Sequence, residues 1–205
     1  MNVPADRADA NAPRSRKQVW ILVAVFFAPL LLAFLFYYGL GIRPAGSTNR
    51  GELIHPPVTL PETELVAADE QNLPANTLRG KWTMVFIGDG ACNERCREAL
   101  TLMRQTRLAL GDDMTRIQRL FLISANCCDR AYLDKEHPGL LLARIDNPPG
   151  EALLQTFPDA VQATNGGRIY LVDPLGNLMM SYAPGAPPKG LLEDLKKLFK
   201  LSHIG

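Results

Sequence analysis

The hydrophobic positions of this chain gather first in one unbroken run near the N-terminus. Residues 19–38 contain no charged side chain, and at about 1.5 Å per residue a helix of this length spans roughly 30 Å, the thickness of a bilayer core. Trp20 stands at one end and the Tyr37–Tyr38 pair at the other, where aromatic side chains commonly mark membrane interfaces. The pattern predicts a transmembrane helix over residues 19–40. A cleaved signal peptide fits less well, because its apolar core is shorter and a small-residue cleavage site would follow it.

Basic residues are denser before this helix than after it: Arg14, Arg16 and Lys17 precede it, and Arg43 and Arg50 follow more sparsely. Because short cytoplasmic segments carry the excess of Lys and Arg, residues 1–18 are expected to form a cytoplasmic tail. We therefore expect a single-pass membrane protein whose C-terminal domain lies outside the cytoplasm, which in a bacterium means the inner membrane and the periplasm.

Past the helix, residues 41–61 are rich in Gly, Pro, Ser and Thr and are expected to form a linker. Residues 62–205 then have the length of one domain. Short apolar runs, typical of buried strands, alternate there with amphipathic stretches typical of helices. Strands are predicted at 82–87, 117–124, 140–145, 168–172 and 178–182, and helices at 92–110, 151–157 and 191–201. This order predicts an α/β fold, a thioredoxin-like three-layer sandwich.

The charge balance limits the classes of function. The chain has 22 Lys and Arg against 21 Asp and Glu, a formal net charge of +1. Nucleic-acid binding needs a basic face, and this balance does not indicate one. No Ser–His–Asp set, phosphate-binding loop or zinc-type spacing of cysteines and histidines appears either, so hydrolase and nucleotide-binding activities are not indicated.

Two cysteines stand where the first central strand passes into the long helix. Cys92 and Cys96 are four residues apart, so both sulfurs are expected on one face of the first helical turn. The positive end of the helix dipole favours thiolate at this junction, and Cys92, nearest the helix start, is expected to be the more reactive thiol. The pair can close a disulfide or present two soft ligands to one metal ion. A purely structural disulfide is the alternative, although closing so short a loop removes little chain entropy.

The segments around this pair resemble a known family. Gly80–Phe86, the Cys92-x-x-x-Cys96 motif and Tyr170–Gly176 (Tyr-Leu-Val-Asp-Pro-Leu-Gly) are similar to segments of the Sco/SenC proteins. Those are membrane-anchored, thioredoxin-fold copper chaperones and thiol reductants that help to assemble the copper sites of cytochrome c oxidase. The resemblance implies that Cys92 and Cys96 act as a redox pair or as Cu(I) ligands. It also implies that the partner is an oxidase subunit, or another copper or thiol protein of the periplasm.

The chain departs from that family at two positions. The family places a proline after the second cysteine, and Arg97 stands there instead. The family also has a histidine shortly before the Tyr-Leu strand as its third copper ligand, and this chain has none there. Asn165 is the nearest equivalent, and an amide is a poor ligand for copper. The missing histidine favours the thiol-reductant role over copper insertion.

A second pair, Cys127 and Cys128, follows the strand predicted at 117–124. Because the carboxyl ends of parallel strands share one sheet edge, these cysteines are hypothesised to face the first pair, as resolving thiols or extra copper ligands. The alternative is that one of them is buried as a small apolar residue. A bridge between the two neighbours would be strained and is not expected. His137, in the loop that follows, is a further candidate for a third ligand or for tuning the thiols, but a solvated loop histidine is the favoured interpretation.

Two other functions stay open. One is a general periplasmic thiol–disulfide oxidoreductase. Such proteins carry Cys-x-x-Cys and a cis-proline in the loop that faces it, whereas the segment around Thr164 and Asn165 has no proline. The other is a non-catalytic thioredoxin-like module, docked beside membrane subunits, whose cysteines are merely structural.

Overall fold

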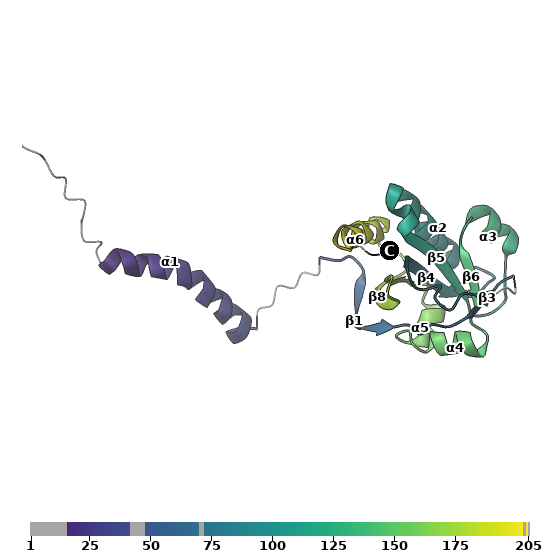
Figure 1. The fold of residues 1–205 in the computed structure, drawn as a ribbon, viewed down its shortest axis with the longest axis horizontal. Helices are drawn as coiled ribbons and strands as arrows, with labels where there is room; N and C mark the ends of the chain where they lie inside the picture. Colours follow the sequence, from purple (N-terminus) through teal and green to yellow (C-terminus); the bar gives the residue numbers. More distant parts are fainter. Residues whose placement is uncertain (1–15, 42–47, 70–71, 203, 205) are drawn as a thin grey trace, which may run out of the picture. The chain divides into compact units, whose positions relative to one another are not determined.

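The computed structural model describes residues 16–41, 48–69, 72–202 and 204. It divides the chain into two compact units, Met1–Ser47 and Thr48–Gly205 (Figure 1). Most of the expected cytoplasmic tail, and the middle of the expected linker, lie outside the described residues.

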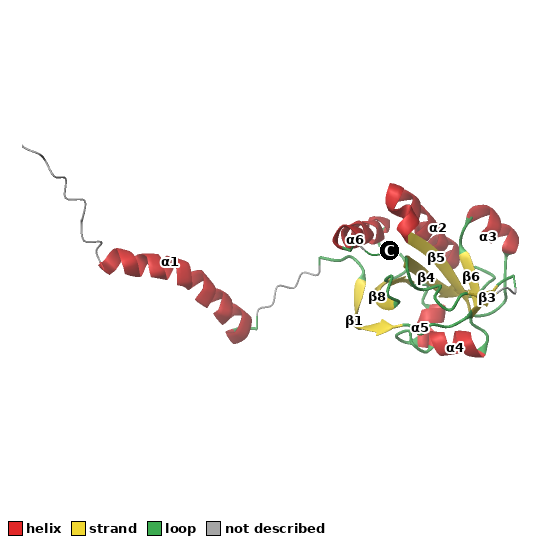
Figure 2. Cartoon of the chain, in the orientation of Figure 1, coloured by secondary structure: helices red, strands yellow, loops and turns green. Residues whose placement is uncertain are grey.

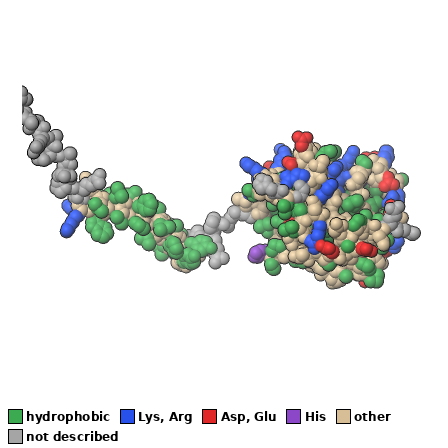
Figure 3. Space-filling model, viewed as in Figure 1, with side chains coloured by type: hydrophobic (Ala, Val, Ile, Leu, Met, Phe, Trp, Pro, Cys, Tyr) green, Lys and Arg blue, Asp and Glu red, His purple; other side chains and the backbone are tan. Residues whose placement is uncertain are grey.

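The first unit contains one apolar helix. Helix α1 (Arg16–Phe34) includes Pro29 and continues through a π-helical turn, η1 (Leu35–Gly39). None of their side chains is buried, and Figure 3 shows this helix covered almost entirely by hydrophobic side chains. The segment Arg16–Gly39 is long and apolar enough to cross a bilayer. The helix predicted from the sequence is therefore confirmed, and α1 is a candidate membrane span.

The second unit is built on one mixed sheet, with eight strands among the described residues (Figure 2). The strand order is β1-β8-β7-β4-β5-β6-β2-β3. The central strands β4, β5 and β6 are parallel, and all other neighbours are antiparallel. The strands are β1 (Glu52–Thr59), β2 (Leu65–Ala67), β3 (Asn72–Leu73), β4 (Trp82–Gly88), β5 (Ile117–Ile123), β6 (Leu141–Arg144), β7 (Ile169–Val172) and β8 (Asn177–Tyr182).

Helices cover both faces of this sheet. They are α2 (Glu94–Ala109), α3 (Arg130–Glu136), α4 (Pro148–Leu154), α5 (Ala160–Asn165) and α6 (Pro188–Leu201), with a 3-10 turn, η2, at Gly111–Arg116. Along β4, Met84 and Phe86 pack with α2, α3 and α6, whereas Val85 and Ile87 pack with α4 and α5. Successive side chains of a strand point to opposite faces, which explains the two hydrophobic cores. The predicted thioredoxin-like three-layer sandwich is confirmed.

One part of the expected linker belongs to the sheet. Residues 52–59 form the edge strand β1, whose pairing with β8 is interrupted between Leu53 and Val58. Pro56 and Pro57 lie in that interruption. An edge strand tolerates proline because the N–H groups on its outer side need no partner in the sheet. The linker prediction is therefore wrong for this segment, because its proline content is equally compatible with an edge strand.

Helix α6 fastens the start of the second unit. The buried carboxylate of Asp194 accepts hydrogen bonds from the backbone N–H groups of Arg50 (2.8 Å) and Gly51 (2.9 Å) and from the Tyr182 hydroxyl (3.1 Å). Burial, together with the charge of Asp194, raises the pKa of Tyr182, so this hydroxyl stays a donor. The backbone of Arg50 and Gly51, near the start of the second unit, is therefore fixed to a buried carboxylate whose two oxygens both accept hydrogen bonds.

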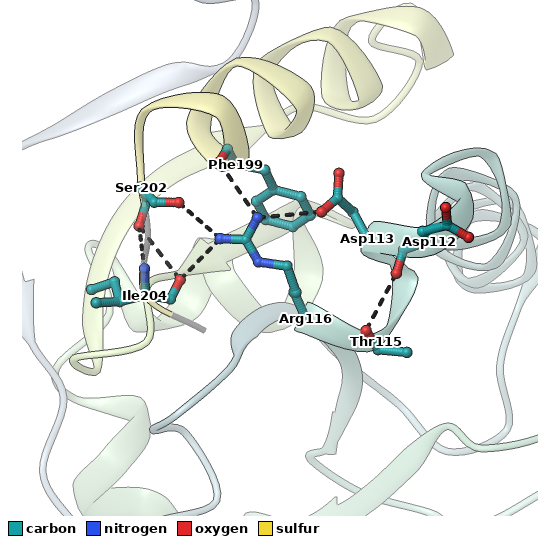
Figure 4. Close-up of polar contacts among 7 residues, drawn as sticks. All are labelled: Asp112, Asp113, Thr115, Arg116, Phe199, Ser202 and Ile204. Carbon is teal, nitrogen blue, oxygen red and sulfur yellow. Dashed lines mark hydrogen bonds and ion pairs between the residues drawn. The ribbon is translucent and has the colours of Figure 1, made fainter.

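A second set of contacts holds the C-terminal end of α6 (Figure 4). The Arg116 guanidinium donates to the carbonyl oxygens of Phe199 (3.4 Å), Ser202 (2.8 Å) and Ile204 (3.2 Å) and pairs with Asp113 (3.3 Å). It also lies 4.8 Å from the centre of the Phe199 ring. These groups join the turn before β5 to the end of α6, on the sheet face that also carries α2.

Candidate functional site

The first cysteine pair lies in the turn between β4 and α2. Cys92 has a φ of +47°, a left-handed conformation that non-glycine residues seldom adopt and that often occurs at functional sites. Asn93 caps the helix, because its side-chain oxygen accepts a hydrogen bond from the Cys96 backbone N–H at 3.1 Å. Cys96 therefore sits in the first turn of α2, with its Cα 5.0 Å from that of Cys92, and the two form a disulfide. The predicted juxtaposition of the two sulfurs is confirmed.

The pair is buried but borders a cleft. Cys92 is 1% exposed and Cys96 3% exposed. A cleft of about 340 Å³ opens beside them, with Asp89, Asn93, Arg95, Cys96, Thr164 and Asn165 in its wall. Cys92 is not part of that wall. Of the two cysteines, Cys96 is therefore the one that borders the cleft.

Asn165 occupies the place where the resemblance expects a histidine. It is the last residue of α5 and shares the cleft wall with Cys96. Neither this wall nor any other described part of the chain brings three side chains of the His, Cys, Asp or Glu type together as a metal site. A reduced Cys92–Cys96 pair would supply two thiolates to a soft ion such as Cu(I), without the imidazole expected from the resemblance.

The second cysteine pair lies on the adjacent loop, after β5. Cys127 is exposed and Cys128 half-buried, and Cys128 packs against the hydrophobic cluster that includes Cys92 and Cys96. The two are joined in a disulfide, which corrects the expectation that these neighbours would not form a bridge with each other. That expectation weighed only local strain, whereas contacts with the β4–α2 turn hold this loop in place.

Those contacts directly join the two cysteine loops, which are the β4–α2 turn and the loop after β5. The Gly90 N–H donates to the Ala125 carbonyl (2.8 Å), and the Gly90 carbonyl accepts from the Asp129 N–H (3.2 Å). The Asn126 side chain donates to the Asp89 carboxylate at 2.7 Å. A Cβ on Gly90 would lie 2.6 Å from the Asn126 carbonyl oxygen, so only glycine permits this approach. The sheet edge thus brings the two cysteine loops together, as the sequence predicted.

Arg97, which replaces the family's proline, spans both loops. Its Nε donates to the Cys92 carbonyl oxygen at 3.2 Å, and its Nη2 lies 3.6 Å from the Asp129 carboxylate. Its guanidinium also stacks 4.6 Å from the centre of the Tyr132 ring. The sequence marked this position only as a departure. No local sequence pattern indicates this bridging role, because the two groups that Arg97 joins, the Cys92 carbonyl and the Asp129 carboxylate, lie far apart along the chain.

His137 is not the solvated loop histidine that the sequence favoured. It is buried at the C-terminal end of α3, 3.1 Å from the Tyr132 hydroxyl. Burial lowers its pKa, and the nearby Arg119 and Arg104 add to that shift while Glu136 opposes it. It is absent from the wall of the cleft beside Cys96. His137 therefore supports the helix beside the second pair and is not placed as a copper ligand.

These features define a thioredoxin-like domain with two neighbouring cysteine pairs, in a chain with an N-terminal helix able to cross a bilayer. Residues 82–202 match the family model described as the transmembrane-like, thioredoxin-like C-terminal domain. The match spans more than half of the chain, and the protein belongs to this family. No curated protein matches the chain in sequence.

Solved structures with the same fold include Sco proteins. Apo Sco1 of Thermus thermophilus is 17% identical with a TM-score of 0.59, covering 75% of this chain and 99% of its own. Copper-bound ScoI of Bradyrhizobium japonicum is 20% identical with a TM-score of 0.51, covering 68% and 98%. A putative protein disulfide isomerase of Bacteroides thetaiotaomicron is 14% identical with a TM-score of 0.55, covering 75% and 95%. The resemblance to Sco/SenC proteins is thus confirmed for the fold.

Proposed function

We propose that this protein is a membrane-anchored, Sco-like thiol–disulfide reductant that prepares cysteines of a copper site during cytochrome c oxidase biogenesis. The observation that carries the proposal is the position of Cys96. It is disulfide-bonded to Cys92, lies in the first turn of α2 and lines a cleft. The helix N-terminus favours the thiolate of a cysteine in this position, and the cleft gives a partner access to it.

The reaction is a pair of thiol–disulfide exchanges. In the reduced protein, the Cys96 thiolate attacks one sulfur of the partner's disulfide, forms a mixed disulfide and releases one partner thiolate. The Cys92 thiolate then attacks Cys96, which closes the Cys92–Cys96 bond and releases the second partner thiolate. Two electrons pass to the partner, whose thiolates take up two protons. Because Cys96 and not Cys92 lines the cleft, this order reverses the one expected from the sequence.

Carriage of Cu(I) as cargo is the second candidate. Similar structures were solved with copper bound, among them ScoI of Bradyrhizobium japonicum and Sco1 of yeast. Two thiolates suit Cu(I), but Asn165 offers only an amide where the resemblance expects a third ligand. The donor set of this chain therefore supports reduction better than tight copper transport.

The proposed location follows from α1. A helix able to cross the bilayer, with basic residues before it, supports a single-pass inner-membrane protein whose N-terminus is cytoplasmic. The thioredoxin-like unit would then face the periplasm, where an oxidase subunit or another copper or thiol protein is its partner.

Single-turnover exchange tests the reductant role. The full chain is purified in detergent, reduced, freed of reductant and mixed with a peptide that carries two cysteines of a partner copper site as a disulfide. We expect stoichiometric reduction of the peptide, lost in Cys92→Ser/Cys96→Ser and kept in Cys127→Ser/Cys128→Ser. No exchange by the unmodified chain would reject the proposal. Exchange with any disulfide peptide at one rate would instead indicate a general oxidoreductase.

An anaerobic Cu(I) titration against a competing chelator tests the second candidate. Tight one-to-one binding that requires Cys92 and Cys96 would establish copper carriage. Binding no tighter than that of the double variant would remove it. Normal oxidase assembly in cells that carry only Cys92→Ser/Cys96→Ser would leave the non-catalytic module as the better account.

A further inference from the structure

The two cysteine pairs differ in how solvent reaches them. Cys92 and Cys96 are buried, with 1% and 3% of their surface exposed. Cys127 is exposed, and Cys128 is half-buried against the cluster that contains the first pair. A protein that carries a reactive thiol and approaches this sheet edge therefore meets Cys127 before any other cysteine.

We propose that Cys127–Cys128 is an electron relay that takes two electrons from the dithiol of a partner protein and passes them to Cys92–Cys96. The inference rests on the proposed function, because a relay has a purpose only if the first pair cycles between disulfide and dithiol. It assigns the partner that reduces this protein to the Cys127 side. The partner that this protein reduces is met at the cleft beside Cys96.

The loop contacts support a transfer between the pairs. Gly90 is hydrogen-bonded to both Ala125 and Asp129. The segment between these two residues, which contains both cysteines of the second pair, is therefore held against the β4–α2 turn. Arg97 joins the Cys92 carbonyl to the carboxylate of Asp129, the residue that follows Cys128 in the sequence. Cys128 packs against the cluster that contains Cys92, and the relay requires the hydrogen-bonded loops to move until the Cys128 sulfur meets that of Cys92.

The transfer balances as a chain of thiol–disulfide exchanges. A donor thiolate attacks the exposed Cys127 sulfur, and Cys128 leaves as a thiolate on the inner side. Cys128 attacks Cys92, forming a Cys92–Cys128 disulfide and releasing the Cys96 thiolate beside the cleft. The donor's second thiolate resolves its bond to Cys127, and Cys127 then attacks Cys128 and releases Cys92. The donor becomes a disulfide, the second pair is restored, and Cys92–Cys96 has gained two electrons and two protons.

Two reductants of different size test the relay. The oxidised full chain in detergent micelles is treated with reduced thioredoxin, a protein dithiol, or with dithiothreitol, a small dithiol. Acid quenching, alkylation and peptide mass spectrometry then give the redox state of each pair over time. In Cys127→Ser/Cys128→Ser, we expect reduction of Cys92–Cys96 by thioredoxin to slow about tenfold or more, while reduction by dithiothreitol changes less than about twofold.

A trapping variant reports the contact itself. Cys96→Ser/Cys127→Ser retains only Cys92 and Cys128, and mild oxidation is expected to join them within the chain. Failure to form this bridge, or an unchanged rate with thioredoxin in Cys127→Ser/Cys128→Ser, would overturn the relay alone. The proposed function would survive that result, because it depends on exchange between Cys92–Cys96 and the partner peptide. A Cys92–Cys96 bond that neither reductant opens would overturn both.

Discussion

The Arg97 side chain donates a hydrogen bond from Nε to the backbone carbonyl of Cys92, 3.2 Å away. The same guanidinium lies 3.6 Å from Asp129 and stacks on Tyr132, so one side chain joins the two cysteine loops. The Sco/SenC proteins place a proline at this position. This chain thus has a side chain that connects the β4–α2 turn to the loop of the second cysteine pair.

Removing this bridge should loosen both loops. Arg97→Ala loses one hydrogen bond, one exposed ion pair and one cation–π contact, and we expect the free energy of unfolding to fall by about 1–2 kcal/mol. Urea denaturation under oxidising conditions measures it. Arg130→Ala is the matched control, since it loses only the exposed ion pair with Asp134 within α3 and should cost less than about 0.5 kcal/mol. Equal losses in the two variants would mean that Arg97 does not bridge the loops.

Asn165 offers a direct test of the missing copper ligand. It shares the cleft wall with Cys96, so Asn165→His would add an imidazole beside the two thiolates. We expect the affinity for Cu(I) to rise by about tenfold or more, the order of magnitude by which changes around a metal alter its binding. Competition with a Cu(I) chelator measures the affinity. Thr164→His, on the same helix and in the same wall, is the positional control. An affinity unchanged by Asn165→His would show that this side chain does not reach the thiolates.

His137 should make stability depend on pH. Its pKa in the folded protein lies below the ordinary 6.5 because of burial, Arg119 and Arg104. The unfolded chain therefore binds a proton first as the pH falls, so stability is complete above about pH 6.5 and decreases below it, by less than about 1.4 kcal/mol per pH unit. Denaturation curves between about pH 7.5 and pH 5.5 should show this slope, and His137→Gln should reduce it. His55→Gln, at an exposed position of β1, should leave it unchanged. A slope that persists in His137→Gln would assign the effect to other groups.

The sequence predicted the central part of the fold well because that part follows from burial. The unbroken apolar runs at Trp82–Gly88 and Ile117–Ile123 are strands buried on both faces, as found. The short helices α3 and α5 were missed, although Asp129 and Asp159 cap them and provide a local signal. Seven and six residues are too few for a hydrophobic period to be evident.

The site was predicted only as far as sheet topology determines it. Because parallel strands end at one edge, the sequence was enough to bring Cys92 and Cys128 to neighbouring loops. The burial of His137, the bridge made by Arg97 and the exposure of Cys127 depend on tertiary contacts between segments far apart in the chain. No local pattern carries that information, and strain arguments alone gave the wrong result for the second disulfide.

The order of attack between Cys92 and Cys96 can be measured with single thiols. In a Cys127→Ser/Cys128→Ser background, Cys92→Ser leaves only the Cys96 thiol and Cys96→Ser leaves only the Cys92 thiol. Cys96 lines the cleft and lies in the first turn of α2, so access and the positive end of the helix dipole both favour its thiolate. We expect Cys96 to react with iodoacetamide about tenfold faster than Cys92 near neutral pH. A faster Cys92 would instead restore the order expected from the sequence and make Cys96 the resolving thiol. Far-ultraviolet circular dichroism of both variants controls for loss of the fold, since neither substitution removes the contacts that hold α2 on the sheet through Leu100 and Met103.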